Sequence, residues 1–221
     1  MSLLRFDRVA CVRRGRMLFE GLSFTLEPGG SAIVTGPNGV GKSSLIRIAA
    51  GLLPPAAGRV ERADPPALLT EAAALDPERT LAQALDFWAK IDGVTFARID
   101  EALTDLDLSD LIDIPVRLLS TGQRRRAALA RVLASPASLW LLDEPANGLD
   151  VAAVERLEAL IARHRETGGA TLIATHQPIE MADAQAITLH HPHPGEGQGP
   201  VSDRLQLGPG LRRGGAGVEA Q

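Results

Sequence analysis

A glycine-rich segment, GPNGVGKSS, places the strongest constraint on how this chain folds. It lies between a short apolar run, residues 31–35, and a stretch of helical periodicity from Lys42 to about Leu53. The segment matches the pattern Gly-x-x-x-x-Gly-Lys-Ser, whose glycines let backbone N–H groups wrap around phosphates at a helix start. An ordinary glycine-rich turn is the alternative, but the flanking strand and helix favour a phosphate-binding loop.

This loop carries two side chains that suit a nucleoside triphosphate and its metal ion. The ammonium of Lys42 would reach the β- and γ-phosphates, and the hydroxyl of Ser43 would ligate Mg²⁺. We therefore expect the nucleotide-binding residues to be Gly36, Pro37, Asn38, Gly39, Val40, Gly41, Lys42, Ser43 and Ser44.

The stretch SLWLLDE predicts the acidic half of the same site. A buried strand at 138–142 would bring Asp143 to the sheet edge where the Mg²⁺ would lie. The next residue, Glu144, could polarise an attacking water as a general base. A strand that ends in Asp-Glu is common, so this interpretation depends on its partnership with Lys42 and Ser43.

The stretch LSTGQRRRAALARVLA predicts a helix with an unusual beginning. Ser120 or Thr121 could cap it, but residues 124–126 are all arginines in the first turns, where the helix macrodipole disfavours positive charge. A bound anion would relieve that conflict, and small residues at a helix N-terminus allow an anion to approach closely. A γ-phosphate is the obvious candidate, although the arginines could also form a solvated face.

The remaining pattern predicts an α/β fold with a mostly parallel sheet. Further strands are expected at 171–175 and, as an N-terminal antiparallel sheet, at 3–9 and 22–26. We interpret about 75–135 as an inserted helical subdomain, in which Thr80 and Gln83 match a capping box and Trp88 belongs to the core. The helical pattern there continues through Leu103, Leu106, Leu111 and Ile112, and an amphipathic helix follows through Val151, Val154, Leu157, Leu160 and Ile161.

Residues 191–221 are rich in glycine and proline and are expected to form a disordered tail. His190, His191 and His193 stand at its start, and a solvated tail is favoured there over a metal site.

Composition excludes several classes of protein. The 221 residues carry a net charge of −4, so no general basic surface favours nucleic acid as a partner. A single cysteine, Cys11, excludes an internal disulfide framework and fits a reducing compartment. The N-terminus lacks a signal-peptide pattern, and no stretch approaches the roughly 18 apolar residues of a membrane span. Any work at a membrane is therefore expected to need a partner.

Taken together, these motifs resemble the ATP-binding-cassette ATPases. The resemblance rests on GPNGVGKSS, LSTGQ, LLDEP, the GLD at 148–150 and the Thr-His at 175–176, and it covers about residues 1–190. It implies ATP as the nucleotide, a P-loop NTPase core and a homodimer that sandwiches ATP between two subunits. His176 would contact the γ-phosphate and orient Glu144. The residues implied to meet ATP from the opposite subunit are Ser120, Thr121, Gly122, Gln123 and Asp150.

Within that superfamily, the chain looks most similar to the haem-exporter ATPases of cytochrome c maturation, on the pieces LFEGLSFTL, IPVRLLSTGQRRRAALAR and THQP. The resemblance implies an ATP-hydrolysing subunit that works with integral-membrane subunits at the cytoplasmic face of a bacterial inner membrane. There it would power haem export, or the release of haem from a haem chaperone, for cytochrome c maturation. A transporter ATPase for another cargo and a soluble ABC ATPase are the alternatives. A catalytically silent scaffold is disfavoured, because Lys42, Asp143, Glu144 and His176 are all present.

Three positions depart from the family pattern. Thr121 replaces the first glycine of the usual signature pair. Glu71 and Ala72 stand near the position where family members usually carry a glutamine that contacts Mg²⁺. An aromatic residue that would stack on adenine is missing before the phosphate loop, where Arg13 or Arg14 could stack through its guanidinium plane.

Overall fold

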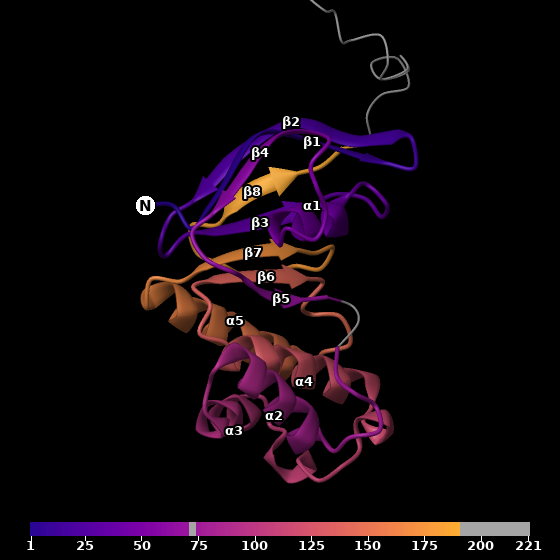
Figure 1. The fold of residues 1–221 in the computed structure, drawn as a ribbon, viewed down its shortest axis with the longest axis vertical. Coiled ribbons are helices and arrows are strands. Elements are labelled where there is room, and N and C mark those ends of the chain that lie inside the picture. The colour runs from indigo at the N-terminus through magenta and orange to yellow at the C-terminus, as the bar shows by residue number, and fades with distance from the viewer. Residues whose placement is uncertain (71–73, 191–221) are drawn as a thin grey trace, which may run out of the picture. The chain divides into compact units, whose positions relative to one another are not determined.

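The N-terminal part of the chain forms a three-stranded antiparallel sheet. We describe residues 1–70 and 74–190 from a computed structural model (Figure 1). Strands β1 (Leu4–Arg13) and β2 (Arg16–Leu26) pair antiparallel, which confirms the predicted N-terminal sheet. On the other side of β1 lies β4 (Ala57–Arg62), which the sequence analysis missed because AGRVER contains no buried residue.

A five-stranded parallel sheet forms the centre of the fold, in the order β5-β6-β7-β3-β8. The three inner strands β6 (Leu139–Asp143), β7 (Ala170–Ala174) and β3 (Ser31–Thr35) confirm the predicted apolar runs to within one residue. They read as continuous apolar segments because the sheet is covered on both faces. The edge strands β5 (Ala67–Leu69) and β8 (Gln185–Thr188) were not predicted, because one is very short and the other is mostly exposed.

Helix α1 (Lys42–Ala49) begins at the predicted lysine but ends four residues before the predicted Leu53. The guanidinium of Arg62, from β4, donates to the carbonyl oxygens of Ile48 and Ala49 at 3.2 and 3.0 Å. These bonds supply partners to carbonyl groups at the end of the helix, where Ile48 also accepts the Gly51 N–H at 3.0 Å. Gly51 then adopts a φ of +77°, which turns the chain away from the helix axis.

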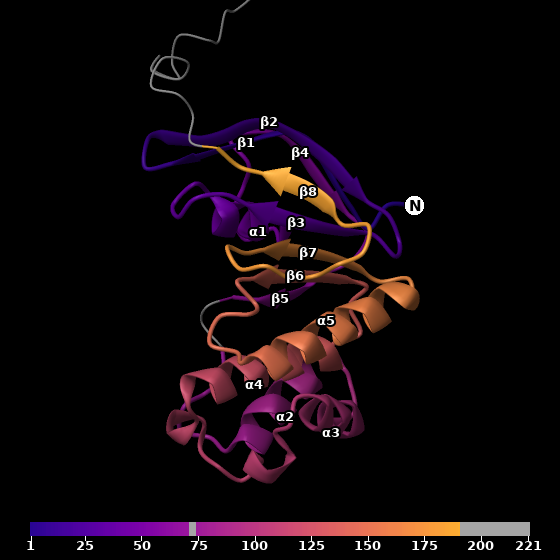
Figure 2. The same ribbon diagram turned by 180° about the vertical axis from the view of Figure 1, so that it is seen from behind.

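Three helices lie together beyond the β5 edge of the parallel sheet: α2 (Leu81–Asp92), α3 (Phe96–Asp105) and α4 (Thr121–Ala134) (Figures 1 and 2). The predicted capping box at Thr80 and Gln83 is confirmed. The helical pattern predicted through Leu111 and Ile112 is interrupted, because Asp107 takes a left-handed φ of +56°. Two short 3₁₀ turns, Ser109–Leu111 and Val116–Leu118, follow in place of a longer helix.

The long helix α5 (Val151–Glu166) runs between this helical group and the sheet (Figure 2). One hydrophobic cluster joins residues of α2, α3, α4 and α5 with β5, β6 and β7. Trp88 packs against it, with the guanidinium carbon of Arg131 3.3 Å from its ring centre, and donates its indole N–H to the carbonyl of Ala74 at 2.8 Å. The helices are therefore packed onto the sheet rather than tethered to it.

Across residues 1–70 and 74–190, no helix combines the length and the apolar character that crossing a membrane requires. The glycine- and proline-rich tail, 191–221, lies outside the described residues, as do His191 and His193. Among the residues that are described, no group of three or more His, Cys, Asp or Glu side chains is arranged to hold a metal ion.

Candidate active site

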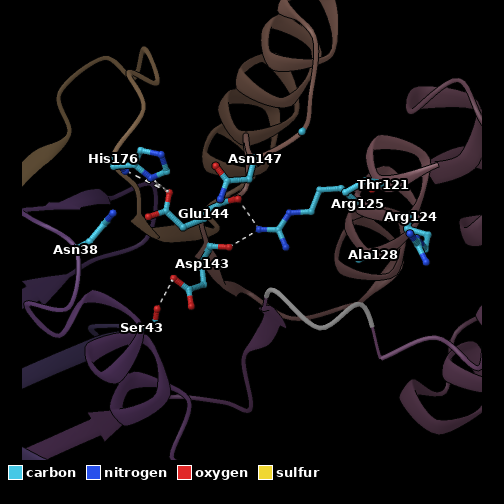
Figure 3. A pocket seen from close by; sticks show the side chains of 11 residues that line it. Asn38, Ser43, Thr121, Arg124, Arg125, Ala128, Asp143, Glu144, Asn147 and His176 are labelled. Atoms are coloured by element: carbon cyan, nitrogen blue, oxygen red, sulfur yellow. Dashed lines mark hydrogen bonds and ion pairs between the residues drawn. The ribbon is translucent and has the colours of Figure 1, made fainter. Parts of the chain in front are cut away.

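The phosphate loop and the acidic strand end meet at one edge of the parallel sheet. Strand β3 leads into the loop and α1, while β6 ends at Asp143 two strands away. Carboxyl ends of parallel strands share one edge, so these segments converge as predicted. The hydroxyl of Ser43 donates to Oδ1 of Asp143 at 3.1 Å (Figure 3). Both groups supply oxygen ligands of the kind that Mg²⁺ prefers.

Lys42 is almost fully buried inside the loop. Its ammonium donates to the carbonyl oxygens of Gly36 at 2.8 Å and Pro37 at 3.4 Å. The same nitrogen lies 4.0 Å from Oε1 of Glu144. A bound phosphate would offer this ammonium a full negative charge in place of neutral carbonyl oxygens. Charge-assisted hydrogen bonds are the stronger kind, so the ammonium would favour the phosphate.

Glu144 is held in a rare backbone conformation directly after β6. Its φ is +50°, in the left-handed region that non-glycine residues seldom adopt. Its N–H donates to the carbonyl of Ala174, at the end of β7, at 2.7 Å. His176 completes the arrangement, with Nδ1 at 2.8 Å and its backbone N–H at 3.2 Å from Oε2 of Glu144. Such strain at a catalytic candidate suggests function.

Burial raises the pKa of the Asp143 carboxyl above its ordinary value, and the nearby charge of Glu144 acts in the same direction. The Ser43 hydrogen bond and the charges of Arg125 and Arg47 oppose this effect. A cation at this carboxylate would favour the ionised form, because an opposite charge within a few ångströms lowers a carboxyl pKa.

A cavity of about 850 Å³ opens between the strand ends and helix α4 (Figure 3). Its walls include residues from the phosphate loop, the start of α4 and the ends of β6 and β7, among them Ser43, Thr121, Arg125, Asp143, Glu144 and His176. The volume lies in the range of small-molecule and cofactor sites. The predicted side chains of Ser43, Asp143, Glu144 and His176 therefore face one space, which Thr121 also reaches from α4. Lys42 is buried within the loop and is not part of this lining.

The start of α4 is a capping box. The Oγ of Ser120 accepts from the Gln123 N–H at 3.2 Å, and the Ser120 N–H donates to Oε1 of Gln123 at 2.8 Å. Of the two predicted caps, Ser120 is the one that the structure shows. The spacing Ser-x-x-Gln is the sequence signature of this arrangement, and it could have predicted a role for Gln123 within its own helix.

Gly122 and Asp150 also have partners within their own chain. A Cβ atom on Gly122 would lie 2.7 Å from the carbonyl oxygen of Gly148, so only glycine allows this approach. Asp150 caps α5 by accepting the Ala153 N–H at 2.8 Å. The contacts expected from Ser120, Thr121, Gly122, Gln123 and Asp150 to ATP of a second subunit remain predictions.

The three consecutive arginines of α4 occupy different environments. Arg125 is buried and donates to backbone carbonyls at the ends of β5 and β6. Arg126 donates to the carbonyl of Leu106 at 3.0 Å, among the helices, and Arg124 is exposed at the cavity wall. Sequence reasoning assigned none of them a separate role.

The structure assigns no site role to the other two positions that depart from the family pattern. Glu71 and Ala72 lie outside the described residues. Arg13 and Arg14 are exposed at the turn between β1 and β2, where Arg14 takes a φ of +51°. Neither arginine lines the cavity at the strand ends.

A phosphate loop at the carboxyl edge of a parallel sheet, with the Asp-Glu pair and His176 beside it, defines an ATPase of the ATP-binding-cassette class. The family described as ABC transporter matches residues 19–147. The chain therefore belongs to the ABC transporter family. Within it, the chain is 56% identical over 187 residues to the cytochrome c biogenesis ATP-binding export protein CcmA of Sphingopyxis alaskensis, covering 85% of this chain and 96% of the relative.

Another relative carries the same name, and solved ABC transporter subunits share the fold. The protein of the same name from Zymomonas mobilis is 49% identical, covering 83% of this chain and 82% of the relative. An ATP-binding subunit of an ABC transporter superposes with a TM-score of 0.75 at 22% identity, covering 86% of this chain and 87% of its own. A subunit of an ABC transporter complex from Clostridium perfringens gives 0.70 at 24% identity, covering 86% and 85%. These structures support the fold class predicted from the sequence.

Proposed function

We propose that the chain hydrolyses ATP with Mg²⁺ between two copies of itself and thereby drives a membrane transporter for cytochrome c maturation. The observation that carries the hydrolytic part is the position of Glu144, fixed by His176 at the strand end and 4.0 Å from the Lys42 ammonium. A carboxylate held beside a phosphate-binding lysine is suited to act as general base on a water that attacks the γ-phosphate.

The other site residues have separate roles that follow from their chemistry. Lys42 exchanges its carbonyl partners for the β- and γ-phosphates, and the N–H groups of the loop hold the remaining phosphate oxygens. Ser43 and Asp143, already 3.1 Å apart, would hold the Mg²⁺, which neutralises charge on the phosphates when bound. His176 keeps the Glu144 carboxylate in orientation and reaches the γ-phosphate.

A second copy of the chain would close the site. The N-terminus of α4 carries Ser120 and Gly122, and backbone N–H groups at a helix start favour a phosphate. This arrangement also accounts for arginines at the positive end of the α4 macrodipole. The γ-phosphate of ATP bound to the opposite subunit would offset the repulsion between the arginine charges and that dipole. Asp150 would lie at the same interface.

The names of the relatives support the proposed cargo and location. Proteins named cytochrome c biogenesis ATP-binding export protein share 40–56% identity with this chain in several bacteria. We propose that this chain likewise serves integral-membrane subunits at the cytoplasmic face of a bacterial inner membrane, with haem as the cargo. The alternatives are another cargo or a soluble ABC ATPase.

Affinity purification of the Glu144→Gln variant from its native membranes, with ATP and Mg²⁺ present, tests this proposal. The variant is expected to bind ATP without hydrolysing it, so the closed dimer and its partners should copurify. Recovery of cytochrome c maturation membrane subunits would support the proposal. A different permease would change the cargo, and ribosomal or DNA-repair proteins would overturn the transporter function. Lys42→Ala, which should not bind ATP, is the control.

A further inference from the structure

We infer that Arg125 is a positioning residue for hydrolysis: its guanidinium fixes the backbone of Glu144 to the start of helix α4. This inference rests on the proposed role of Glu144 as general base. It assigns Arg125 neither a contact with ATP nor a part in proton transfer.

Three hydrogen bonds of Arg125 lead to the carboxyl edge of the sheet. Its Nη1 donates to the carbonyl of Thr70, directly after β5, at 2.7 Å. Its Nη2 donates to the carbonyls of Asp143 and Glu144, at the end of β6 (Figure 3). One side chain therefore joins α4 to the ends of two neighbouring strands.

Burial makes these bonds matter. Arg125 is only 8% exposed, and burying a charge is costly unless hydrogen bonds such as those of its Nη1 and Nη2 compensate for the lost water. A guanidinium presents several N–H donors in a fixed plane, so it can serve carbonyls on two strands simultaneously. A lysine ammonium at the same position keeps the charge but loses this planar geometry.

The bond to Glu144 completes a set of constraints on that residue. Its N–H is held by Ala174, its carboxylate by His176 and its carbonyl by Arg125. The left-handed φ of +50° is costly for glutamate, so it needs surrounding contacts to maintain it. Without the Arg125 bond, the peptide after Glu144 could rotate and carry the carboxylate away from the water that it must activate.

The bond between Arg125 and Glu144 links the hydrolytic residues of one subunit to the helix that would meet ATP of the other subunit. Arg125 lies two residues after Gln123, in the first turns of the helix that would meet ATP of the other subunit. A shift of α4 therefore acts directly on the backbone of Glu144. We expect Glu144 to reach its working position only when α4 is correctly placed.

The test compares Arg125→Lys and Arg125→Gln with Arg126→Lys in the complete complex recovered from membranes. Arg126 is the matched control, because it also donates to backbone carbonyls but those of Leu106 and Asp107, away from β6. ATP affinity, the ATP-induced rise in Tm and kcat are measured for each. Displacement of a catalytic group by about 1 Å is enough to lower kcat on the order of 10²-fold.

We expect both Arg125 variants to lose kcat on that scale while their ATP affinity and ATP-induced rise in Tm stay at the wild-type level. Arg126→Lys should keep its kcat. The inference is overturned if the Arg125 variants retain kcat, or if affinity, Tm rise and kcat fall together as in a general loss of structure. Failure of the underlying function would look different, because the wild-type complex itself would then hydrolyse no ATP.

Discussion

His176 contacts Glu144 through two separate donors, the ring nitrogen Nδ1 at 2.8 Å and the backbone N–H at 3.2 Å from the same carboxylate oxygen. The backbone bond belongs to the turn after β7 and survives any substitution at position 176 other than proline. The ring bond depends on the imidazole. The two contributions to the orientation of Glu144 can therefore be separated by mutation.

Substitution of His176 by alanine removes only the ring contact. We expect kcat to fall on the order of 10²-fold, the usual effect of removing one stabilising group from a reaction centre, with ATP affinity changed far less. Steady-state hydrolysis and a nucleotide-binding titration measure the two quantities. His190→Ala removes an exposed histidine that does not line the cavity and should have no effect. Unchanged turnover in His176→Ala would show that the backbone bond suffices.

We expect Gly122→Ala to lower the stability of the single folded chain, independently of dimer formation. The new Cβ would lie 2.7 Å from the Gly148 carbonyl oxygen of the same chain, so one of the two segments must move. We expect a loss of about 1–3 kcal/mol in the free energy of unfolding, as for other overpacked sites. Urea unfolding without nucleotide measures it, with exposed Thr121→Ala as the control. Wild-type stability would confine the role of Gly122 to the dimer.

Two capping boxes of the same geometry allow stability and activity to be compared. Thr80 caps α2 and Ser120 caps α4, each paired with a glutamine three residues later. Alanine at either position should cost about 1 kcal/mol of stability, measured by urea unfolding. Only Ser120→Ala should also weaken ATP-dependent dimerisation on a sizing column. Equal dimerisation in the two variants would remove Ser120 from the proposed interface.

His164 should make the stability of the fold depend on pH. Its ring stacks on Trp140 at 3.8 Å, and burial lowers its pKa, an effect that backbone hydrogen bonds with Ser138 and Ala170 oppose. The unfolded chain then binds more protons, so stability is complete above the ordinary pKa of 6.5 and falls as the pH drops through and below that value.

His164→Gln should flatten this dependence, because glutamine does not titrate in the same range. Melting temperatures measured from about pH 8 down to about pH 5, across the ordinary histidine pKa, give the comparison. His190→Gln, at an exposed histidine, should behave as the wild type. A variant at position 164 with the wild-type pH profile would show that other groups cause the dependence.

The inner architecture could be predicted from sequence because it depends on strong local patterns. The runs SAIVT, LWLLD and ATLIA are apolar throughout, since strands in the middle of a covered parallel sheet are buried on both faces. The strands that escaped prediction lie at sheet edges, where β4 and β8 are mostly exposed and carry no such pattern. Their positions are decided by tertiary pairing rather than by their own residues.

The site residues also divide into those that a local sequence pattern predicts and those that tertiary contacts determine. Spacing within one segment predicted Lys42 and Ser43, and strand ends predicted Asp143 and Glu144, because these residues sit at fixed places on local structure. Arg125 could not be distinguished from the arginines beside it, since its environment comes from strands 55 and 18 residues away in sequence. The end of α1 escaped for a similar reason, because Arg62 reaches it from another sheet.

Trp88 gives the molecule an optical probe at a useful place. Its indole N–H is bonded to the carbonyl of Ala74, and Arg131 covers its ring. A rearrangement that moves Ala74 away from α2 must break the indole hydrogen bond, and one that moves α4 away from α2 must withdraw Arg131 from the ring. Its emission colour and intensity would then change with the position of the helices, so a working cycle could be followed in real time without attaching a dye.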